Sequence, residues 1–289
     1  MSRVLLTGAN GVVGYPLSQY LSDADITFYR VSRALKDQEN SVRWDMQNAL
    51  DEPLIERLKV AEIDTLIHCS PIWLLPAHLQ NLYSIGVRRI VAFSSSSVTS
   101  KQNSTDTEEQ LLVKQLSKAE DAVAQFCNNQ GIAYTIFRPS MIYGYARDQN
   151  ITHIAKFIKR FGFMLLIGQA NGLRQPVHAD DLATASLTVL NNAASEGKTY
   201  YMAGETTLTY RAMVDAIFNG LNKRSIVVSL PLIIFRSALR VAALVGRFSY
   251  TAEMANRMNQ DLVYDISPAQ QDFLYSPQSF LTNPERDLP

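Results

Sequence analysis

The segment that most constrains the fold is a glycine-spaced loop near the start of the chain. A short apolar run leads into the loop Thr7-Gly8-Ala9-Asn10-Gly11-Val12-Val13-Gly14, and a helical pattern with Leu17 and Leu21 on one face follows it. In such a strand–turn–helix unit, backbone N–H groups and the helix N-terminus bind a pyrophosphate. The spacing Gly8-x-x-Gly11-x-x-Gly14 differs from the commonest dinucleotide-binding pattern. A tight turn that binds no ligand is therefore the alternative interpretation.

Apolar strands and amphipathic helices alternate along the first half of the chain. The pattern predicts strands at 26–31, 41–44, 63–69, 89–93 and 134–137, with helices between them. This alternation implies right-handed crossovers and a parallel sheet with helices on both faces. The fold class we expect is α/β, a Rossmann-like doubly wound parallel sheet with a smaller C-terminal substrate lobe. We assign 1–145 and 176–203 to the sheet domain, and 146–175 and 204–289 to the lobe.

Composition limits the class of protein. The chain is 47% hydrophobic and 19% charged, and its 27 basic and 27 acidic residues give a net charge of zero, so we expect a soluble protein without a nucleic-acid partner. Cys69 and Cys127 form no CxxC pair, which indicates thiols in a reducing compartment. Met1 lies close to the first strand, leaving no room for a targeting segment, so we expect a cytoplasmic location. Four widely spaced histidines predict no metal site.

The segment 230–247 is apolar but carries three basic residues, Arg236, Arg240 and Arg247. These charges argue against a membrane span. Their spacing leaves two interpretations, an amphipathic helix on a membrane surface or a lid helix of the lobe with a solvated face. The zero net charge of the chain favours the lid.

Five segments, in this order, resemble the extended short-chain dehydrogenase/reductase superfamily, specifically its NAD(P)-dependent nucleoside-diphosphate-sugar epimerase/dehydratase branch. They are the glycine loop, Asp64-Thr65-Leu66-Ile67-His68-Cys69, Phe93-Ser94-Ser95-Ser96-Ser97-Val98, Arg138-Pro139-Ser140-Met141-Ile142-Tyr143-Gly144 and Gln175-Pro176-Val177-His178-Ala179-Asp180-Asp181-Leu182. Together they cover residues 3 to about 190. Ordered matches are more specific than any single one.

The resemblance implies a bound nicotinamide dinucleotide. The residues it implies for cofactor binding are Thr7, Gly8, Asn10, Gly11, Val12, Val13, Gly14, Ser32, Arg33, Asp45, Cys69, Ser70, Pro71, Ser94 and Pro139. Ser32 stands where an aspartate would contact the ribose hydroxyls, and Arg33 offers a planar fork to a 2′-phosphate, so NADP is favoured over NAD. A solvated Arg33 is the alternative. Asp45 resembles an adenine-contacting aspartate, and a turn-forming aspartate is equally compatible.

Hydride chemistry in this superfamily uses a serine or threonine together with Tyr-x-x-x-Lys on one helix. Residues four apart share a helix face, so the ammonium lowers the phenol pKa and tyrosine can act as an acid or base. Ser95 is the expected serine, with Ser96 as the alternative. No tyrosine occurs between Tyr83 and Tyr134, so the pair is absent. Lys118 is the candidate lysine, and Tyr143, after Arg138-Pro139, is a candidate substitute for the phenol, as is Tyr145.

Three further residues are implied for substrate binding. Asn150 and Arg174 resemble positions that bind the diphosphate of a nucleotide sugar, and His178 belongs to a motif near the substrate lobe. The bulky segment 70–76 replaces a longer substrate-facing loop, and it either narrows the nicotinamide side of the pocket or fills it.

Two functions fit these observations. One is an NADP-dependent oxidoreductase or epimerase-like enzyme that acts on a nucleotide-linked sugar or a similar carbonyl compound. The other is a dinucleotide-binding sensor, scaffold or assembly factor without turnover. The missing tyrosine favours the second, whereas the retained lobe motifs favour the first, which we prefer at this stage. Either is compatible with a homodimer.

Overall fold

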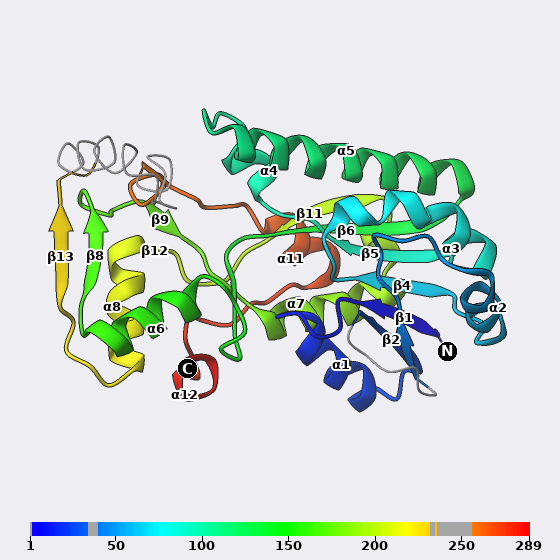
Figure 1. Ribbon diagram of the computed structural model, residues 1–289, viewed down its shortest axis with the longest axis horizontal. Coiled ribbons are helices and arrows are strands. Elements are labelled where there is room, and N and C mark those ends of the chain that lie inside the picture. Colours follow the sequence, from blue (N-terminus) through cyan, green and yellow to red (C-terminus); the bar gives the residue numbers. More distant parts are fainter. Residues whose placement is uncertain (1, 34–39, 232–234, 236–255) are drawn as a thin grey trace.

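A computed structural model describes residues 2–33, 40–231, 235 and 256–289. Its centre is a seven-stranded sheet in the order β11-β6-β5-β4-β1-β2-β3, in which every neighbouring pair is parallel. The strands are β1 (Val4–Thr7), β2 (Phe28–Ser32), β3 (Ser41–Arg43), β4 (Thr65–His68), β5 (Arg89–Phe93), β6 (Ala133–Pro139) and β11 (Lys198–Met202). The expected doubly wound Rossmann-like α/β fold is confirmed (Figure 1).

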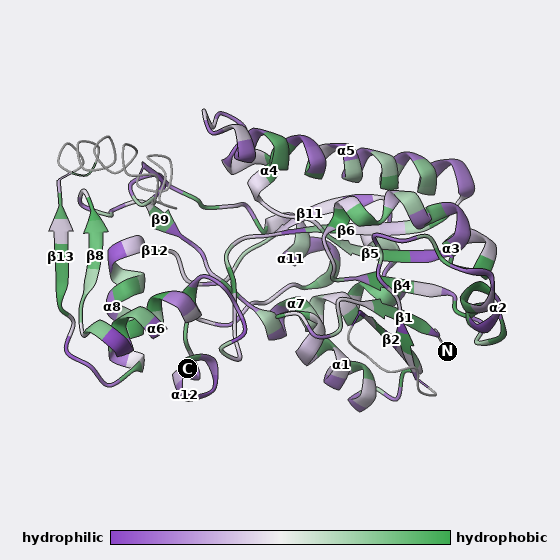
Figure 2. Ribbon diagram, in the orientation of Figure 1, coloured by the Kyte–Doolittle hydropathy of each residue, from purple (hydrophilic) through white to green (hydrophobic). Residues whose placement is uncertain are grey.

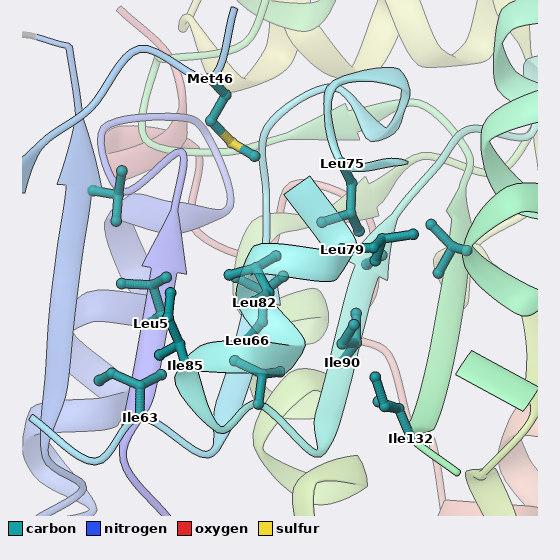
Figure 3. Close-up of a cluster of buried hydrophobic side chains, with 14 of the residues drawn as sticks. Leu5, Met46, Ile63, Leu66, Leu75, Leu79, Leu82, Ile85, Ile90 and Ile132 are labelled. Carbon is teal, nitrogen blue, oxygen red and sulfur yellow. The ribbon is translucent and has the colours of Figure 1, made fainter. Parts of the chain in front are cut away.

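Helices cover both faces of the sheet, as the buried strands require. On one face lie α2 (Glu52–Val60), α3 (Leu79–Ile85) and α5 (Thr107–Gln130), and on the other lie α1 (Gly14–Asp23) and α7 (Ala179–Thr188) (Figure 1). Successive side chains of a strand point to opposite faces, so β1 places Leu5 in the first core cluster and Leu6 in the second. Figure 3 shows the first cluster, with α3 lying over the strands.

The chain order brings one late segment back to the sheet. β11 forms the edge of the sheet beside β6, and α7 packs against α1. A second segment, predicted to belong to the small lobe, also lies on the sheet. Its helix α11 (Ser267–Phe273) packs on β11, and Phe273 and Tyr275 are buried in the second core cluster. The predicted lobe of 204–289 is therefore corrected over these residues, because their apolar side chains cover the sheet.

The smaller lobe has its own apolar core. α6 (Ile151–Phe161) and α8 (Tyr210–Gly220) pack together over the pair β8 (Met164–Ile167) and β13 (Val227–Leu230). Two further strand pairs connect the lobe to the sheet, β7 (Ile142–Tyr143) with β10 (Val177–His178), and β9 (Leu173–Arg174) with β12 (Leu208–Thr209). The short helix α12 (Pro284–Asp287) packs on α8.

Short elements complete the chain. They are the 3₁₀ turns η1 (Ile72–Leu74), η2 (Pro76–His78), η3 (Val189–Asn191) and η4 (Ala193–Ser195), and the one-turn helix α4 (Ser97–Ser100). The predicted amphipathic segment 230–247 falls largely outside the described residues, and Arg236, Arg240 and Arg247 are among those not described. Within the described ranges, no helix combines the length and the apolarity that a bilayer crossing needs.

The centre of the sheet is expected to dominate stability. Leu66 of β4 is fully buried, so Leu66→Ala should lower the free energy of unfolding by about 2–5 kcal/mol through lost burial and the cavity left behind. Urea denaturation measures this. The same change at Leu111, which is 55% exposed on α5, should stay within about 0.5 kcal/mol of wild type. Equal losses in the two variants would contradict this view of the core.

Candidate functional site

The glycine loop lies against the end of the neighbouring strand β4. Gly8 has a positive φ of 69°, and a Cβ there would come within 2.7 Å of the Cys69 carbonyl carbon. A Cβ on Gly14 would lie 2.2 Å from the Gly8 carbonyl oxygen. Gly11 N–H donates to that oxygen (2.8 Å), which closes the turn before α1 begins. The glycines are thus required for close backbone approach.

A buried side-chain contact joins the same two strands. Thr7 Oγ1 lies 2.8 Å from His68 Nδ1, and His68 Nε2 lies 3.2 Å from the Pro71 carbonyl oxygen. Because a carbonyl only accepts, Nε2 carries the proton and Thr7 donates to Nδ1. Burial lowers the pKa of His68 to about 4, so the ring is neutral near pH 7. The contact fixes how the segment after β4 enters the site.

A pocket of about 340 Å³ opens beside the glycine loop at the carboxyl ends of β4, β5 and β6. Eight residues predicted from the sequence line it together: Val12, Val13, Cys69, Ser70, Pro71, Ser94, Ser95 and Pro139. The other lining residues are Ile72, Trp73, Phe93, Leu112, Leu116 and Ile142, all apolar or aromatic. The bulky segment 70–76 therefore narrows the pocket, because η1 packs against α5 and forms one wall of the pocket.

The two pocket serines differ in their contacts. Ser94 Oγ donates to Glu120, a buried carboxylate that is also paired with Arg138. Ser95 Oγ accepts the Ser97 N–H (3.1 Å), which leaves its own hydroxyl proton pointing elsewhere. Ser95 is thus the serine whose proton can be offered to a ligand, and its catalytic role stays a prediction. Ser96 is buried and lines no part of this pocket.

The face of α5 toward the pocket carries leucines. Leu112 and Leu116 line the pocket, and they lie four residues apart, which is also the spacing of the superfamily's tyrosine and lysine. Lys118 is exposed and lies off this face, so it does not line the pocket, and its catalytic role stays a prediction. Glu120 sets the rotation of α5. It pairs with Arg138 of β6, so the helix face that carries Glu120, Leu116 and Leu112 is directed inward. Counting back by fours from this anchor would have found both leucines.

Neither tyrosine substitutes for the missing phenol in the pocket. Tyr143 is fully buried, its hydroxyl accepts the Leu281 N–H (3.0 Å), and burial raises its pKa far from neutrality. Its predicted catalytic role is therefore corrected to packing against His178 and Phe280. Tyr145 donates to Asp180, and burial and this hydrogen bond raise its pKa as well.

The three predicted substrate residues do not line the pocket. Arg174 is buried, and its guanidinium donates to the carbonyls of Leu173, Arg257 and Gln260. His178 accepts the Asp180 N–H at the start of α7, and its Nε2 lies 3.0 Å from Asp287 Oδ1. Both are corrected to structural roles, because protein groups already use their polar atoms. Asn150 is exposed at the start of α6 and contacts Asp148 through its backbone N–H.

The end of β2 matches the predicted ribose side of the site. Asn10 Nδ2 donates to Ser32 Oγ (3.1 Å), which ties the glycine loop to this strand. Arg33 follows as an exposed residue, and Arg43 of β3 is the register partner of Ser32. Register partners on adjacent strands point to the same face. Arg33 thus follows Ser32 in the chain, and Arg43 lies beside it on the neighbouring strand.

Asp45 forms a turn. Its carboxylate accepts the Gln47 N–H (3.1 Å), and its carbonyl accepts the Asn48 N–H. These contacts match the turn-forming interpretation of Asp45 that the sequence left open. Across the described residues, no group of three or more His, Cys, Asp or Glu is arranged to hold a metal ion.

Comparisons with known proteins bear on the family resemblance and on the fold. Residues 74–203 match the model of the NAD dependent epimerase/dehydratase family. The solved structure of UDP-glucuronic acid 4-epimerase from Bacillus cereus, in complex with UDP-glucuronic acid and NAD, covers 99% of this chain and 97% of its own, with a TM-score of 0.74 and 16% identity. The resemblance noted from the sequence is confirmed, and the structural likeness supports the fold.

Two curated relatives are described as NADH dehydrogenase [ubiquinone] 1 alpha subcomplex subunit 9, mitochondrial. The Dictyostelium discoideum protein is 28% identical over 127 residues, which are 40% of this chain and 35% of that protein. The Arabidopsis thaliana protein is 31% identical over 98 residues, 34% of this chain and 24% of that protein. The chain therefore spans about a third or less of the length of these relatives.

The neutral, buried His68 predicts a pH dependence. Its folded pKa of about 4 lies below the unfolded value of about 6.5, so its contribution to stability is full above pH 6.5 and is lost as the pH falls toward 4. His68→Gln should remove up to about 3 kcal/mol of this acid-side loss. Urea denaturation between these pH values measures the difference from wild type.

Asp181 acts in the opposite direction. Burial raises its pKa in the folded protein to about 6, so this residue stabilises the protein increasingly as the pH falls. It is present in both proteins, so its effect cancels in the difference. His153→Gln, at an exposed histidine on α6, is the matched control and should follow wild type. Parallel curves for His68→Gln and wild type would refute the assignment.

Proposed function

Since the chain carries an epimerase-family domain on a Rossmann-like fold, we propose that it binds NADP at the glycine loop without catalysing hydride transfer. The observation that carries the proposal is the pair Leu112 and Leu116 on the pocket face of α5. A positioned acid or base typically contributes about 10²–10⁴-fold to a reaction rate. Leucine supplies neither a proton nor a charge.

The other lining groups do not replace the missing pair. Among the described residues that line the pocket, Cys69 is the one with a readily ionisable side chain, and burial raises its thiol pKa. The serine hydroxyls can donate a hydrogen bond to a nicotinamide amide or a carbonyl. They do not release a proton near neutral pH without a neighbouring base. The site therefore suits binding and orientation.

The curated relatives support a role in an assembly. Their printed names make them subunits of a NADH dehydrogenase. We infer that this chain acts as a dinucleotide-loaded scaffold, sensor or assembly factor, in which the bound cofactor stabilises the fold. Any ligand that binds only the folded state stabilises it by mass action.

A second function is favoured by one observation, the available Ser95 hydroxyl in the pocket. It would polarise a carbonyl in an NADP-dependent reductase or epimerase-like enzyme. The structural relative binds a nucleotide sugar together with NAD, so a nucleotide-linked sugar is the substrate class for this alternative.

The choice of NADP rests on the end of β2. This strand and the residue after it contain no acid to repel a 2′-phosphate, and Arg33 and Arg43 lie on either side of Ser32. A guanidinium pairs with phosphate through two parallel hydrogen bonds. The family name and the bound neighbours specify NAD, so this preference is a departure that we propose for this chain.

We expect the purified protein to bind NADPH and to show no oxidation of it with ketones derived from nucleotide sugars. Calorimetry measures binding, and absorbance of NADPH measures turnover. Gly14→Ala should abolish binding, because its Cβ would lie 2.2 Å from the Gly8 carbonyl oxygen, whereas Gly131→Ala, with no atom within 4 Å of its Cβ, should not. Oxidation that Ser95→Ala slows strongly would decide for the enzyme instead.

Cofactor preference provides a separate test. Arg33→Ala and Arg43→Ala should each weaken NADP binding about tenfold or more, since a charged hydrogen bond contributes about 1.5–3 kcal/mol, and leave NAD binding nearly unchanged. Arg224→Ala, at an exposed arginine of the lobe, is the matched control. Equal wild-type affinity for NAD and NADP would rule out the phosphate site.

A further inference from the structure

The outer end of the small lobe carries an exposed apolar face. Leu165 and Val228 belong to the β8–β13 pair, Phe163 and Ile226 directly precede the two strands, and Phe163, Leu165, Ile226 and Val228 are 36%, 38%, 51% and 49% exposed. Leu165 and Val228 are register partners, and Met164 N–H donates to the Ile226 carbonyl, so these side chains form one continuous surface. The alternate residue Leu166 is buried on the opposite face of the pair. Figure 2 shows the hydrophobic colouring of β8 at this end of the molecule.

Aromatic side chains from α6 extend this surface. The ring of Phe157 lies 4.6 Å from that of Phe161 and 5.7 Å from that of Phe163, measured between centroids. Phe161 is 50% exposed at the end of the helix. We name the surface of Phe157, Phe161, Phe163, Leu165, Ile226 and Val228 the lobe-end patch. Contiguous exposed apolar residues of this kind mark interaction surfaces.

Most of the charged side chains around the lobe-end patch are basic. Exposed cations stand on α6 and in the turn before β13: Lys156, Lys159, Arg160, Lys223 and Arg224. The Arg160 guanidinium lies 5.1 Å from the Phe161 ring centroid. In the sequence, neither 149–179 nor 216–252 contains an aspartate or a glutamate.

Two contacts reduce the positive charge around the lobe-end patch. Lys159 Nζ donates to the Pro289 carbonyl (2.7 Å), and Asp215 of α8 accepts from Ser225 near the turn. The remaining cations of the patch still outnumber the acids, although the whole chain has a net charge of zero. The charge of the protein is therefore segregated, with positive potential gathered at the apolar end.

From exposed aromatic rings within a basic rim, we propose that the lobe-end patch binds the surface of an anionic lipid bilayer. Aromatic side chains suit the headgroup boundary, and each basic side chain near an anionic surface adds attraction. Lysine is depleted in interfaces between proteins, so three lysines on this rim favour lipid over a protein partner. The binding is peripheral and reversible, and it is independent of the dinucleotide function.

Co-sedimentation with vesicles tests the proposal on the full chain. The protein should bind vesicles of equimolar phosphatidylcholine and phosphatidylglycerol, and it should stay in solution with phosphatidylcholine alone. Raising the ionic strength from about 0.1 M to 1 M should release it, since the screening length falls from about 10 Å to 3 Å. Absence of binding to the anionic vesicles at low salt would overturn the proposal.

Two pairs of variants separate the contributions. Lys156→Glu with Arg160→Glu should weaken vesicle binding by at least about 25-fold, at roughly fivefold for each cation lost. Lys114→Glu with Lys118→Glu makes the same charge change on exposed positions of α5 and should bind nearly as wild type. Phe161→Ser with Phe163→Ser should weaken binding, whereas Val60→Ser, at a residue 81% exposed on α2, should not.

Three results would contradict the lipid assignment. Equal losses in the patch and control variants would show general charge effects. A dimer in solution that Phe161→Ser with Phe163→Ser dissociates, without vesicle binding by wild type, would assign the patch to a second copy of the chain. Binding to neutral and anionic vesicles alike would remove the role of the basic rim. NADP binding measured in the same variants reports folding, and its failure in wild type would leave the vesicle result unaffected.

Discussion

The site depends on one close backbone contact, between Gly8 and the Cys69–Ser70 peptide at the end of β4. No side chain fits there, because a Cβ on Gly8 would lie 2.7 to 2.9 Å from three backbone atoms. The hydrogen bond between the Thr7 and His68 side chains also joins the ends of β1 and β4. Together they bring the glycine turn, the start of α1 and the segment after β4 into one pocket.

The character of that pocket is set by α5. The ion pair of the buried Glu120 with the partly buried Arg138 joins this helix to β6 and fixes its rotation about its own axis. A buried charged pair is costly unless its geometry is well satisfied, and here Ser94 supplies a further hydrogen bond. As a result Leu112 and Leu116 face the pocket, and the lysines of the helix face solvent. The Rossmann-like fold is present, while the face of α5 toward the pocket is apolar.

The two ends of the molecule carry different kinds of surface. The sheet domain carries the glycine loop with Arg33 and Arg43 next to Ser32, whereas the small lobe has exposed phenylalanines and lysines at its outer end. The first surface is formed by the close approach of backbone segments, and the second by an exposed strand pair. A cofactor-binding scaffold with a membrane-facing lobe is consistent with this division.

The sequence by itself determined the sheet, its flanking helices and the glycine turn, because strand and helix periods and glycine spacing are local properties of the chain. It also determined that tyrosine is missing from α5. The tertiary structure decided which residues of α5 face the pocket, because the rotation of the helix depends on an ion pair formed across 18 positions of sequence. Strand pairing likewise places Arg43 beside Ser32. Contacts with the C-terminal part of the chain bury Tyr143, Arg174 and His178. Such contacts join residues distant in sequence, so no local pattern could reveal them.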